Sequence, residues 1–345
     1  MKIDPGSLVE LVGALRARVE LDFKRDIQLA ARAFGRETRS AWIPGGGAII
    51  NGDDAAALPC DGGYMLLAAE GMRAELLAAD PWFAGFASVL TNVNDIAAMG
   101  GRPWAVVDVL FLGSADNALV LEGMAAASAA YGVPVVGGHT TRVSGASMLS
   151  VAVVGRATRI IPGGTARPGQ VVVAAIDLGG AFRGGGGNFD AATSAPGASL
   201  RARVGLLSEL AEAGLVGAGK DVSMAGLCGT LWMMLEASGC GARLDLAAIP
   251  APPGCDGLRW LTAFPSFGFV LAVDPGAVAA VCARFDAVGV AAAPIGDITG
   301  GSILELFYDG QRAVYKDVGE APLTGFGHPD LVNRDAQSPD RRSTS

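Results

Sequence analysis

The chain of 345 residues is long enough for two domains, and its hydrophobic fraction of 51% can fill two cores. Its formal net charge of −8 argues against nucleic acid or an anionic membrane surface as the main partner. The five cysteines form no Cys-x-x-Cys pair, which indicates neither a zinc site nor a disulfide framework. No apolar signal core opens the chain and no apolar stretch reaches the roughly 20 residues of a membrane span, so we expect a soluble cytoplasmic protein without membrane contact.

The first predicted element is one helix from residue 7 to about residue 34. Its apolar residues recur every three or four positions, which places them on one stripe of a helix. Ser7 is the expected N-cap. A glycine-rich loop at 44–47 then leads into Asn51-Gly52-Asp53-Asp54-Ala55-Ala56.

The Asp53-Asp54 pair is the first candidate for chemistry. Neighbouring carboxylates repel each other unless a cation lies between them, and hard oxygen ligands suit Mg²⁺ that protein and phosphate hold jointly. Gly and Asp are also ordinary turn residues, so the pair alone leaves a metal site and a surface turn as alternatives. A strand predicted at 64–69 ends at Glu70, whose carboxylate either reaches into a cleft or lies in a solvated loop.

A second helix is predicted to begin at Asp80, with Asp80 as its cap and Pro81 in its first turn, and to end at the glycine pair 100–101. Four polar side chains fall between its apolar positions, namely Thr91, Asn92, Asn94 and Asp95. Polar groups are costly to bury without partners. This polar face is therefore either exposed or lines a metal site.

Strands at 104–112 and 133–136 flank a helix predicted at 115–131. The second strand runs into Gly137-Gly138-His139-Thr140-Thr141-Arg142, whose glycines and hydroxyls are typical of a phosphate-binding loop. His139 is one of only two histidines in the chain. It is either a hydrogen-bonded structural residue or a catalytic group.

The Pro and Gly density of 156–169 predicts a boundary between a first domain, 1–160, and a second domain, 161–330. The second domain alternates predicted strands and helices in the same way, and a loop at 182–188 holds four consecutive glycines. Asp221-Val222-Ser223 is predicted to cap a helix that runs through Leu235, and the last strand is predicted at 301–308. The charged, Ser-rich tail 331–345 is predicted to be disordered.

These motifs fall in a known order. Gly52-Asp53-Asp54-Ala55-Ala56, Asn92-Val93-Asn94-Asp95-Ile96-Ala97-Ala98-Met99-Gly100, the Gly137-Gly138-His139 loop and Asp221-Val222-Ser223 together resemble the aminoimidazole-ribonucleotide synthetase-like (PurM-like) superfamily over most of residues 1–325. The helix motif is the most specific of them. Among the characterised branches, the motifs most resemble thiamine-monophosphate kinase, and selenophosphate synthetase and the hydrogenase-maturation enzyme are related to it.

The resemblance implies a two-domain α/β (α+β) fold. An N-terminal α/β domain would form a dimeric β-barrel with a second subunit, and a C-terminal α/β domain would follow. It implies a homodimer that binds ATP and Mg²⁺ in clefts at the dimer interface. It assigns metal binding to Asp54, Glu70, Asp95, His139 and Asp221, with Asp95 and His139 also catalytic. It assigns nucleotide contacts to Gly52, Asp53, Asn92, Gly137, Gly138, Thr140, Arg159 and Ser223.

The chain departs from the kinase pattern at several of these positions. It has His139 and Met224 where the kinase has Asp, and Ala68 and Ala69 where the kinase has hydroxyls. The kinase substrate motif is replaced by the residues at 264–268. Selenophosphate synthetase needs a reactive Cys near the N-terminus, whereas the first cysteine here, Cys60, follows the acidic motif.

The sequence therefore predicts ATP- and Mg²⁺-dependent phosphoryl transfer to a small-molecule acceptor. Thiamine-monophosphate kinase proper is one alternative, and a nucleotide-binding protein without catalysis is another. All three depend on one expectation, that Asp54, Asp95 and Asp221 meet in space.

Overall fold

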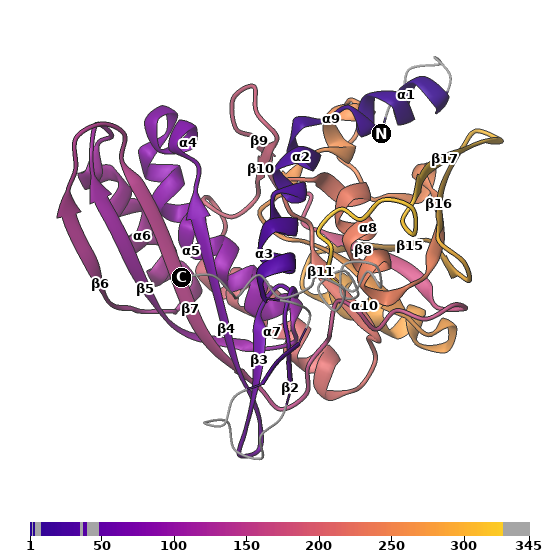
Figure 1. Cartoon of the computed structure of the whole chain (residues 1–345), viewed down its shortest axis with the longest axis horizontal. Helices are drawn as coiled ribbons and strands as arrows, with labels where there is room; N and C mark the ends of the chain where they lie inside the picture. The colour runs from indigo at the N-terminus through magenta and orange to yellow at the C-terminus, as the bar shows by residue number, and fades with distance from the viewer. Residues whose placement is uncertain (2, 4–7, 35–36, 40–47, 327–345) are drawn as a thin grey trace, which may run out of the picture.

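The computed structural model describes residues 1, 3, 8–34, 37–39 and 48–326. Its first half is built on a five-stranded sheet, which Figure 1 shows on the left. In spatial order the strands are β3 (Ala56–Cys60), β4 (Gly63–Met72), β7 (Met148–Ala157), β5 (Arg102–Leu112) and β6 (Val135–Arg142). Within this sheet β5 and β6 pair in parallel, and the other neighbouring strands pair antiparallel.

Helices cover one face of this sheet. Alternate strand residues such as Leu66, Val106 and Val151 are fully buried against α5 (Pro81–Ala98) and α6 (Asn117–Tyr131). Helix α5 begins as predicted, because the Phe83 N–H donates to the Asp80 carboxylate and Pro81 is the first helical residue. The short helix α4 (Ala74–Ala79) precedes it.

The second half is built on a seven-stranded sheet that is buried on both faces. Val172 and Ala174 of its strand β8 contact one core, while Val173 and Ala175 contact the other. This explains why β8 is a continuous apolar run rather than an alternating one. In spatial order the strands are β11 (Ala218–Asp221), β14 (Gly268–Val273), β8 (Val171–Ile176), β15 (Ala291–Thr299), β12 (Gly241–Asp245), β16 (Ile303–Tyr308) and β17 (Gln311–Asp317).

The remaining elements pack around these two sheets. Helices α7 (Gly197–Glu212) and α10 (Val278–Ala287) contribute to the core that also contains α5, and α8 (Gly226–Ser238) contributes to the other core. The smaller elements are β1 (Glu37–Arg39), β2 (Ala48–Ile50), β9 (Ala181–Phe182), β10 (Asn188–Asp190), β13 (Phe264–Pro265), α9 (Gly257–Leu261) and the 3-10 turns Leu246–Ala248 and Pro275–Ala277. Within the described ranges, no helix has the length and apolar character to cross a membrane.

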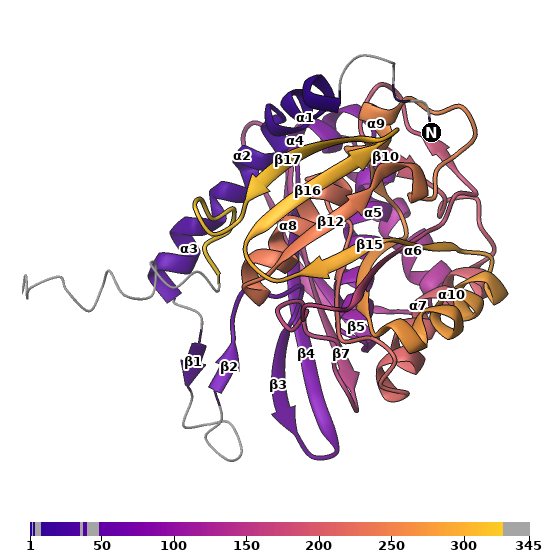
Figure 2. The ribbon, with the colours of Figure 1, turned by 90° about the vertical axis from the view of Figure 1, so that its right-hand side faces the viewer.

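The predicted N-terminal helix is wrong as a single element. The chain forms α1 (Leu8–Arg16), α2 (Val19–Arg25) and α3 (Ile27–Phe34), which we call the N-terminal arm. Extended backbone at Arg18, with φ −70° and ψ 128°, breaks the helix. The break lets α1 lie along β17 (Figure 2). There the Arg16 guanidinium donates to the backbone oxygens of Tyr315 and Val314.

Three further expectations are corrected. The phosphate loop predicted at 137–142 is strand, because these residues belong to β6 and pair in register with β5. Asp221 ends β11 and does not cap a helix, since α8 begins only at Gly226. The strand at 301–308 is followed by β17, so it is not the last. The predicted Ser7 cap, the loop at 44–47 and the tail at 331–345 lie outside the described residues.

The segment 158–170, between β7 and β8, contains neither helix nor strand. We therefore keep the division into residues 1–160 and 161–330 as a proposal. The arm does not follow this division. It precedes the five-stranded sheet in the sequence, but it packs on the seven-stranded sheet of the second half.

Candidate functional site

A cavity of about 970 Å³ opens between the two halves of the chain. Its volume lies at the upper end of the usual range for ligand sites, about 300–1,000 Å³. The walls come from segments far apart in sequence, which are the arm, residues 51–54, the end of β4, α5, residues 183–188, the end of β11 and the segment around Phe326. Predicted site residues that line it are Gly52, Asp53, Asp54, Glu70, Asp95, Asp221 and Ser223.

The polar face of α5 is buried, so the alternative of an exposed face is wrong. Thr91 and Asp95 line the cavity, and as residues they are only 7% and 6% exposed. Asn94 points toward the second half of the chain, where its amide donates to the Ser266 backbone oxygen at 2.9 Å. Asn92 is fully buried, and its amide donates to the Ser88 oxygen at 2.8 Å.

Asp95 carries an incomplete hydrogen-bonding shell. Its Oδ2 atom is buried and accepts no hydrogen bond from any described residue. A buried carboxylate oxygen without a partner is unfavourable unless a cation or donor approaches it from the cavity. Because Asp95 lies in the last turn of α5, a helix whose residues from Phe83 to Ala98 are all buried, this oxygen is held in a fixed position.

Four carboxylates gather at this end of the cavity, and burial raises the pKa of each. The pKa of Asp95 lies well above its ordinary value, first through burial and then through the nearby charges of Asp221, Glu70 and Asp54. Burial and the neighbouring Asp54 raise the pKa of Asp221 to about 8. Like charges that raise each other's pKa in this way are relieved when a cation binds among them.

Two lysines bring positive charge to the same end. Lys220 lies between Asp53 and Asp54, with its Nζ 3.0 Å from one carboxylate and 2.5 Å from the other. Burial alone lowers the pKa of Lys220, but these two carboxylates outweigh that effect and hold its pKa above the ordinary value. Lys24 comes from the arm, and its charge lowers the pKa of Glu70 and Asp221.

These residues fit a magnesium ion that shares its coordination with phosphate. The donor set is all carboxylate oxygen, which Mg²⁺ prefers, and Asp95 supplies a buried oxygen without a partner. No group of three His, Cys, Asp or Glu side chains among the residues described is placed to hold a metal alone. An ion here would therefore take part of its coordination from a bound triphosphate, as Mg²⁺ usually does.

The pKa of Asp221 predicts a pH-dependent stability in metal-free buffer. Between its ordinary value of 3.8 and about 8, the folded chain keeps a proton on Asp221 that the unfolded chain has released. Raising the pH through this window therefore lowers the free energy of unfolding. We expect Asp221→Asn to weaken this dependence, measured as the change in Tm between pH 5.5 and pH 8 in EDTA. Equal changes in Tm for the two proteins would contradict it.

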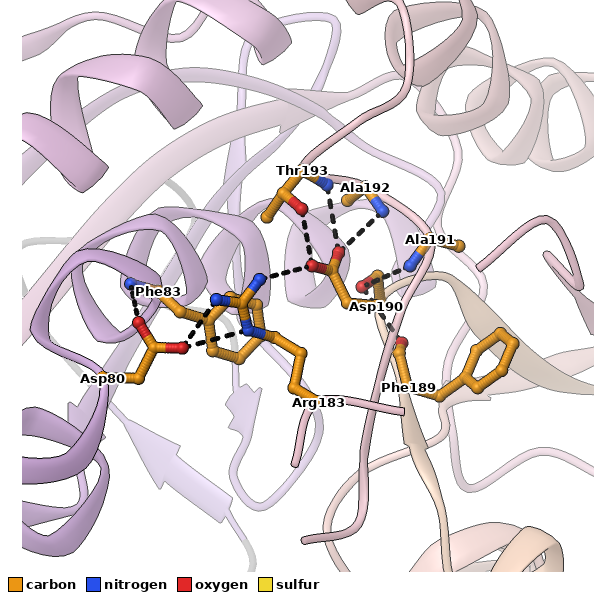
Figure 3. Close-up of polar contacts among 9 residues, drawn as sticks. Asp80, Phe83, Arg183, Phe189, Asp190, Ala191, Ala192 and Thr193 are labelled. Atoms are coloured by element: carbon orange, nitrogen blue, oxygen red, sulfur yellow. Dashed lines mark hydrogen bonds and ion pairs between the residues drawn. The ribbon is translucent and has the colours of Figure 1, made fainter. Parts of the chain in front are cut away.

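The opposite end of the cavity has a different chemistry, shown in Figure 3. The Arg183 guanidinium donates to Asp80 at 2.6 Å and to Asp190 at 3.0 Å, and it lies 4.3 Å from the centre of the Phe83 ring. Asp80 also caps α5, whereas Asp190 belongs to β10, so Arg183 ties the two halves together. Residues 184–187, all glycine, follow it along the cavity wall.

The structure leaves six predicted nucleotide or metal residues outside the cavity of one chain. Gly137, Gly138, His139 and Thr140 lie on β6, where the His139 side chain is exposed. Arg159 donates to the Glu212 backbone oxygen, and Asn92 is buried inside α5. Their roles stay predictions.

Sequence reasoning missed Lys24, Lys220 and Arg183. A signal for the lysines was available, because the chain contains only four lysines and one of them immediately precedes Asp221. Two of the four line this one cavity. Arg183 carries no comparable signal among the many arginines of the chain.

Comparison with known proteins places these features in a family. The family model "AIR synthase related protein, N-terminal domain" matches residues 52–157, and the corresponding C-terminal model matches residues 168–309. An uncharacterised protein of Synechocystis is 46% identical over 92% of this chain and 98% of its own length. The thiamine-monophosphate kinase of Caulobacter vibrioides is 28% identical over 75% of this chain and 81% of its own length.

The fold has counterparts among solved structures. PurL of Thermotoga maritima in complex with ADP matches with a TM-score of 0.71 at 17% identity. The match covers 90% of this chain and 52% of PurL, so this chain spans about half of that protein. At this identity the likeness concerns the fold alone.

Proposed function

Because the chain belongs to the AIR synthase related protein family, we propose that it transfers a phosphoryl group from ATP, with Mg²⁺, to a small-molecule acceptor. The observation that carries this proposal is the convergence of Asp54, Asp95 and Asp221 on one cavity. These residues lie far apart in the sequence, and each comes from a different element. The names of two similar proteins, a kinase and an ADP complex, support the use of ATP.

The proposed roles follow from the chemistry of the acidic end. Asp54, Glu70, Asp95 and Asp221 would hold Mg²⁺, which when bound offsets charge on the transferred phosphoryl group. Ser223 lies beside them with a buried Oγ that has no partner in the described part of the chain, so it can donate to a nucleotide oxygen. The fixed position of Asp95 suits a reaction that depends mainly on positioning and electrostatic stabilisation.

The acceptor would lie toward the glycine-rich end. Arg183 and the glycines at 184–187 leave a polar wall there with room for close approach, since a Cβ at Gly184 or Gly185 would meet no atom within 4 Å. Met224 and the substituted segment at 264–268 distinguish this cavity from the kinase pattern. For this reason we place thiamine-monophosphate kinase activity second.

We also propose that the chain forms a homodimer through the uncovered face of the five-stranded sheet. Val107 and Val109 of β5 are 42% and 38% exposed on that face, and Leu67 of β4 is 48% exposed. An apolar sheet face of this kind is typical of a surface that a partner covers. In such a dimer, His139 and its neighbours on β6 would contribute to the cavity of the other copy.

The dimer proposal predicts that charge on this face separates the subunits. Changing Val107 and Val109 together to Lys is expected to convert the dimer into a monomer, because two ammonium groups cannot be buried there without partners. Sedimentation velocity measures the mass directly. Val9→Lys is the control, because Val9 is 66% exposed on α1, away from this sheet. A wild-type protein that sediments as a monomer at all concentrations would contradict the proposal.

The proposed function is tested by supplying Mg·ATP and a panel of small-molecule acceptors to the purified protein. We expect ADP release with at least one acceptor and none without Mg²⁺. Formation of thiamine diphosphate from thiamine monophosphate would identify the kinase alternative. Tight Mg·ATP binding without ADP release across the panel would favour a non-catalytic nucleotide-binding protein.

A further inference from the structure

Lys220 lies inside the carboxylate cluster as the second-last residue of β11, and its side chain is only 8% exposed. We propose that Lys220 is a permanent cation of this site, which takes the place beside Asp53 and Asp54 that a second Mg²⁺ would otherwise fill. The inference rests on the proposed function, because it concerns how the same cavity balances the charge of a metal-bound triphosphate. Lys220 acts here as a positioning residue and not as a proton donor or acceptor.

The first argument is that both carboxylate oxygens of Asp53 are already engaged by donors from the protein. Its Oδ1 atom accepts from Lys220 at 3.0 Å and from the Asp54 N–H at 3.0 Å. Its Oδ2 atom accepts from the Gly163 N–H at 2.6 Å. Asp53 is therefore an anchor that holds the ammonium group, although its neighbour and its sequence context suggest a metal ligand.

The second argument is that the backbone is shaped around this ion pair. A Cβ at position 163 would lie 2.4 Å from Asp53 Oδ1 and 3.0 Å from Lys220 Nζ. Only glycine therefore lets the segment that follows β7 approach closely enough to donate its N–H. Three separate segments of the chain, at 53–54, 163 and 220, meet to enclose one ammonium group.

The third argument is that free oxygens remain on the other side of the cluster. Asp95 Oδ2 is buried without a partner among the described residues, and Asp95 is 94% buried as a residue, with 6% exposure. Asp54 Oδ2 makes only a 3.3 Å contact with the Asp221 N–H. One divalent ion has ligands there. A second ion beside Asp53 would meet the ammonium group, which repels it.

The test counts bound cations in the nucleotide complex. The full chain is saturated with the ATP analogue AMPPCP, and free Mn²⁺ is measured by electron paramagnetic resonance during titration. We expect one Mn²⁺ per chain for the wild type and for Lys220→Arg, which keeps the charge. Lys220→Met removes the charge while keeping a similar length, so we expect two Mn²⁺ per chain and a Tm that rises with Mn²⁺ concentration more steeply than in the wild type.

Lys24→Met is the matched control. It removes the other lysine that lines the cavity, but Lys24 forms no ion pair within 4 Å in the structure as described, so we expect its Mn²⁺ count to stay at one.

Two results would overturn the inference while leaving the proposed function standing. They are two Mn²⁺ per wild-type chain, or one Mn²⁺ in a folded Lys220→Met protein. If Lys220→Met does not fold, the wild-type count still decides between one ion and two. A wild-type chain that binds neither AMPPCP nor Mn²⁺ would overturn the proposed function, and this inference with it.

Discussion

Asp95→Asn is expected to lower the rate of ADP release by about 100-fold or more, because it removes a fixed charge from the site of phosphoryl transfer. The asparagine has nearly the same shape, and Asp95 accepts no hydrogen bond at Oδ2 from the described residues that the change would break. Replacing a buried carboxylate whose pKa is already raised removes a source of repulsion. We therefore expect the Tm of the metal-free variant to equal or exceed that of the wild type.

This combination of a large loss in rate with no loss in stability separates a functional role from a structural one. ADP release and Tm are measured on the same samples. Glu209→Gln, which removes an exposed carboxylate from α7, serves as the control for a change in net charge. Wild-type rates in Asp95→Asn would exclude Asp95 from the chemistry, and a much lower Tm would point to a structural role.

Gly123→Ala is expected to have the largest effect on stability. Helices α5 and α6 cross at two reciprocal glycines, so that a Cβ on Gly123 would lie 1.9 Å from the Trp82 oxygen, and one on Gly85 would lie 1.9 Å from the Val120 oxygen. Both obstacles are backbone atoms, which cannot swing aside. The helices must separate, and we expect the free energy of unfolding to fall by about 2–3 kcal/mol, a typical value for overpacking.

Gly13→Ala is the matched control for this prediction. Gly13 lies inside α1, is exposed, and would place its Cβ within 4 Å of nothing. Alanine should therefore raise the free energy of unfolding there by up to about 1 kcal/mol, through helix propensity alone. Urea titration measures both changes. A Gly123→Ala protein as stable as the wild type would mean that the two helices do not cross as closely as described.

Local sequence signals predicted the parts of this fold that depend on near neighbours. Helix α5 is an example, because its cap at Asp80, its Pro81 start and its apolar spacing all act within a few residues. The meeting of Asp54, Asp95 and Asp221 was also expected, but from the resemblance to a superfamily and not from spacing. Nothing local in the sequence specifies that residues 54 and 221 become neighbours.

The predictions from sequence were wrong where contacts between residues distant in the sequence determine the local structure. The break at Arg18 depends on where α1 can pack against β17, which the apolar stripe of the arm does not reveal. The run of glycines and hydroxyls after Val136 reads as a loop, yet pairing with β5 keeps it extended as part of β6. Lys220 was overlooked because a buried lysine is unusual, and only the two carboxylates that surround it explain its position.

The arm has a consequence for how the chain can be divided. Leu8, Val12 and Leu15 are nearly fully buried in the core of the second half, and the Gln28 amide donates to the backbone oxygens of Pro322 and Leu323. The arm is thus joined to the last described residues, and both line the cavity, through Lys24 and Phe326 respectively.

We therefore expect that the two matched domains do not fold as separate modules. A fragment that begins near residue 161 would leave an apolar surface bare where the arm belongs, and it would lose one wall of the ligand cavity as well. The arm thus completes the core of the second half, although it lies before the first half in the sequence.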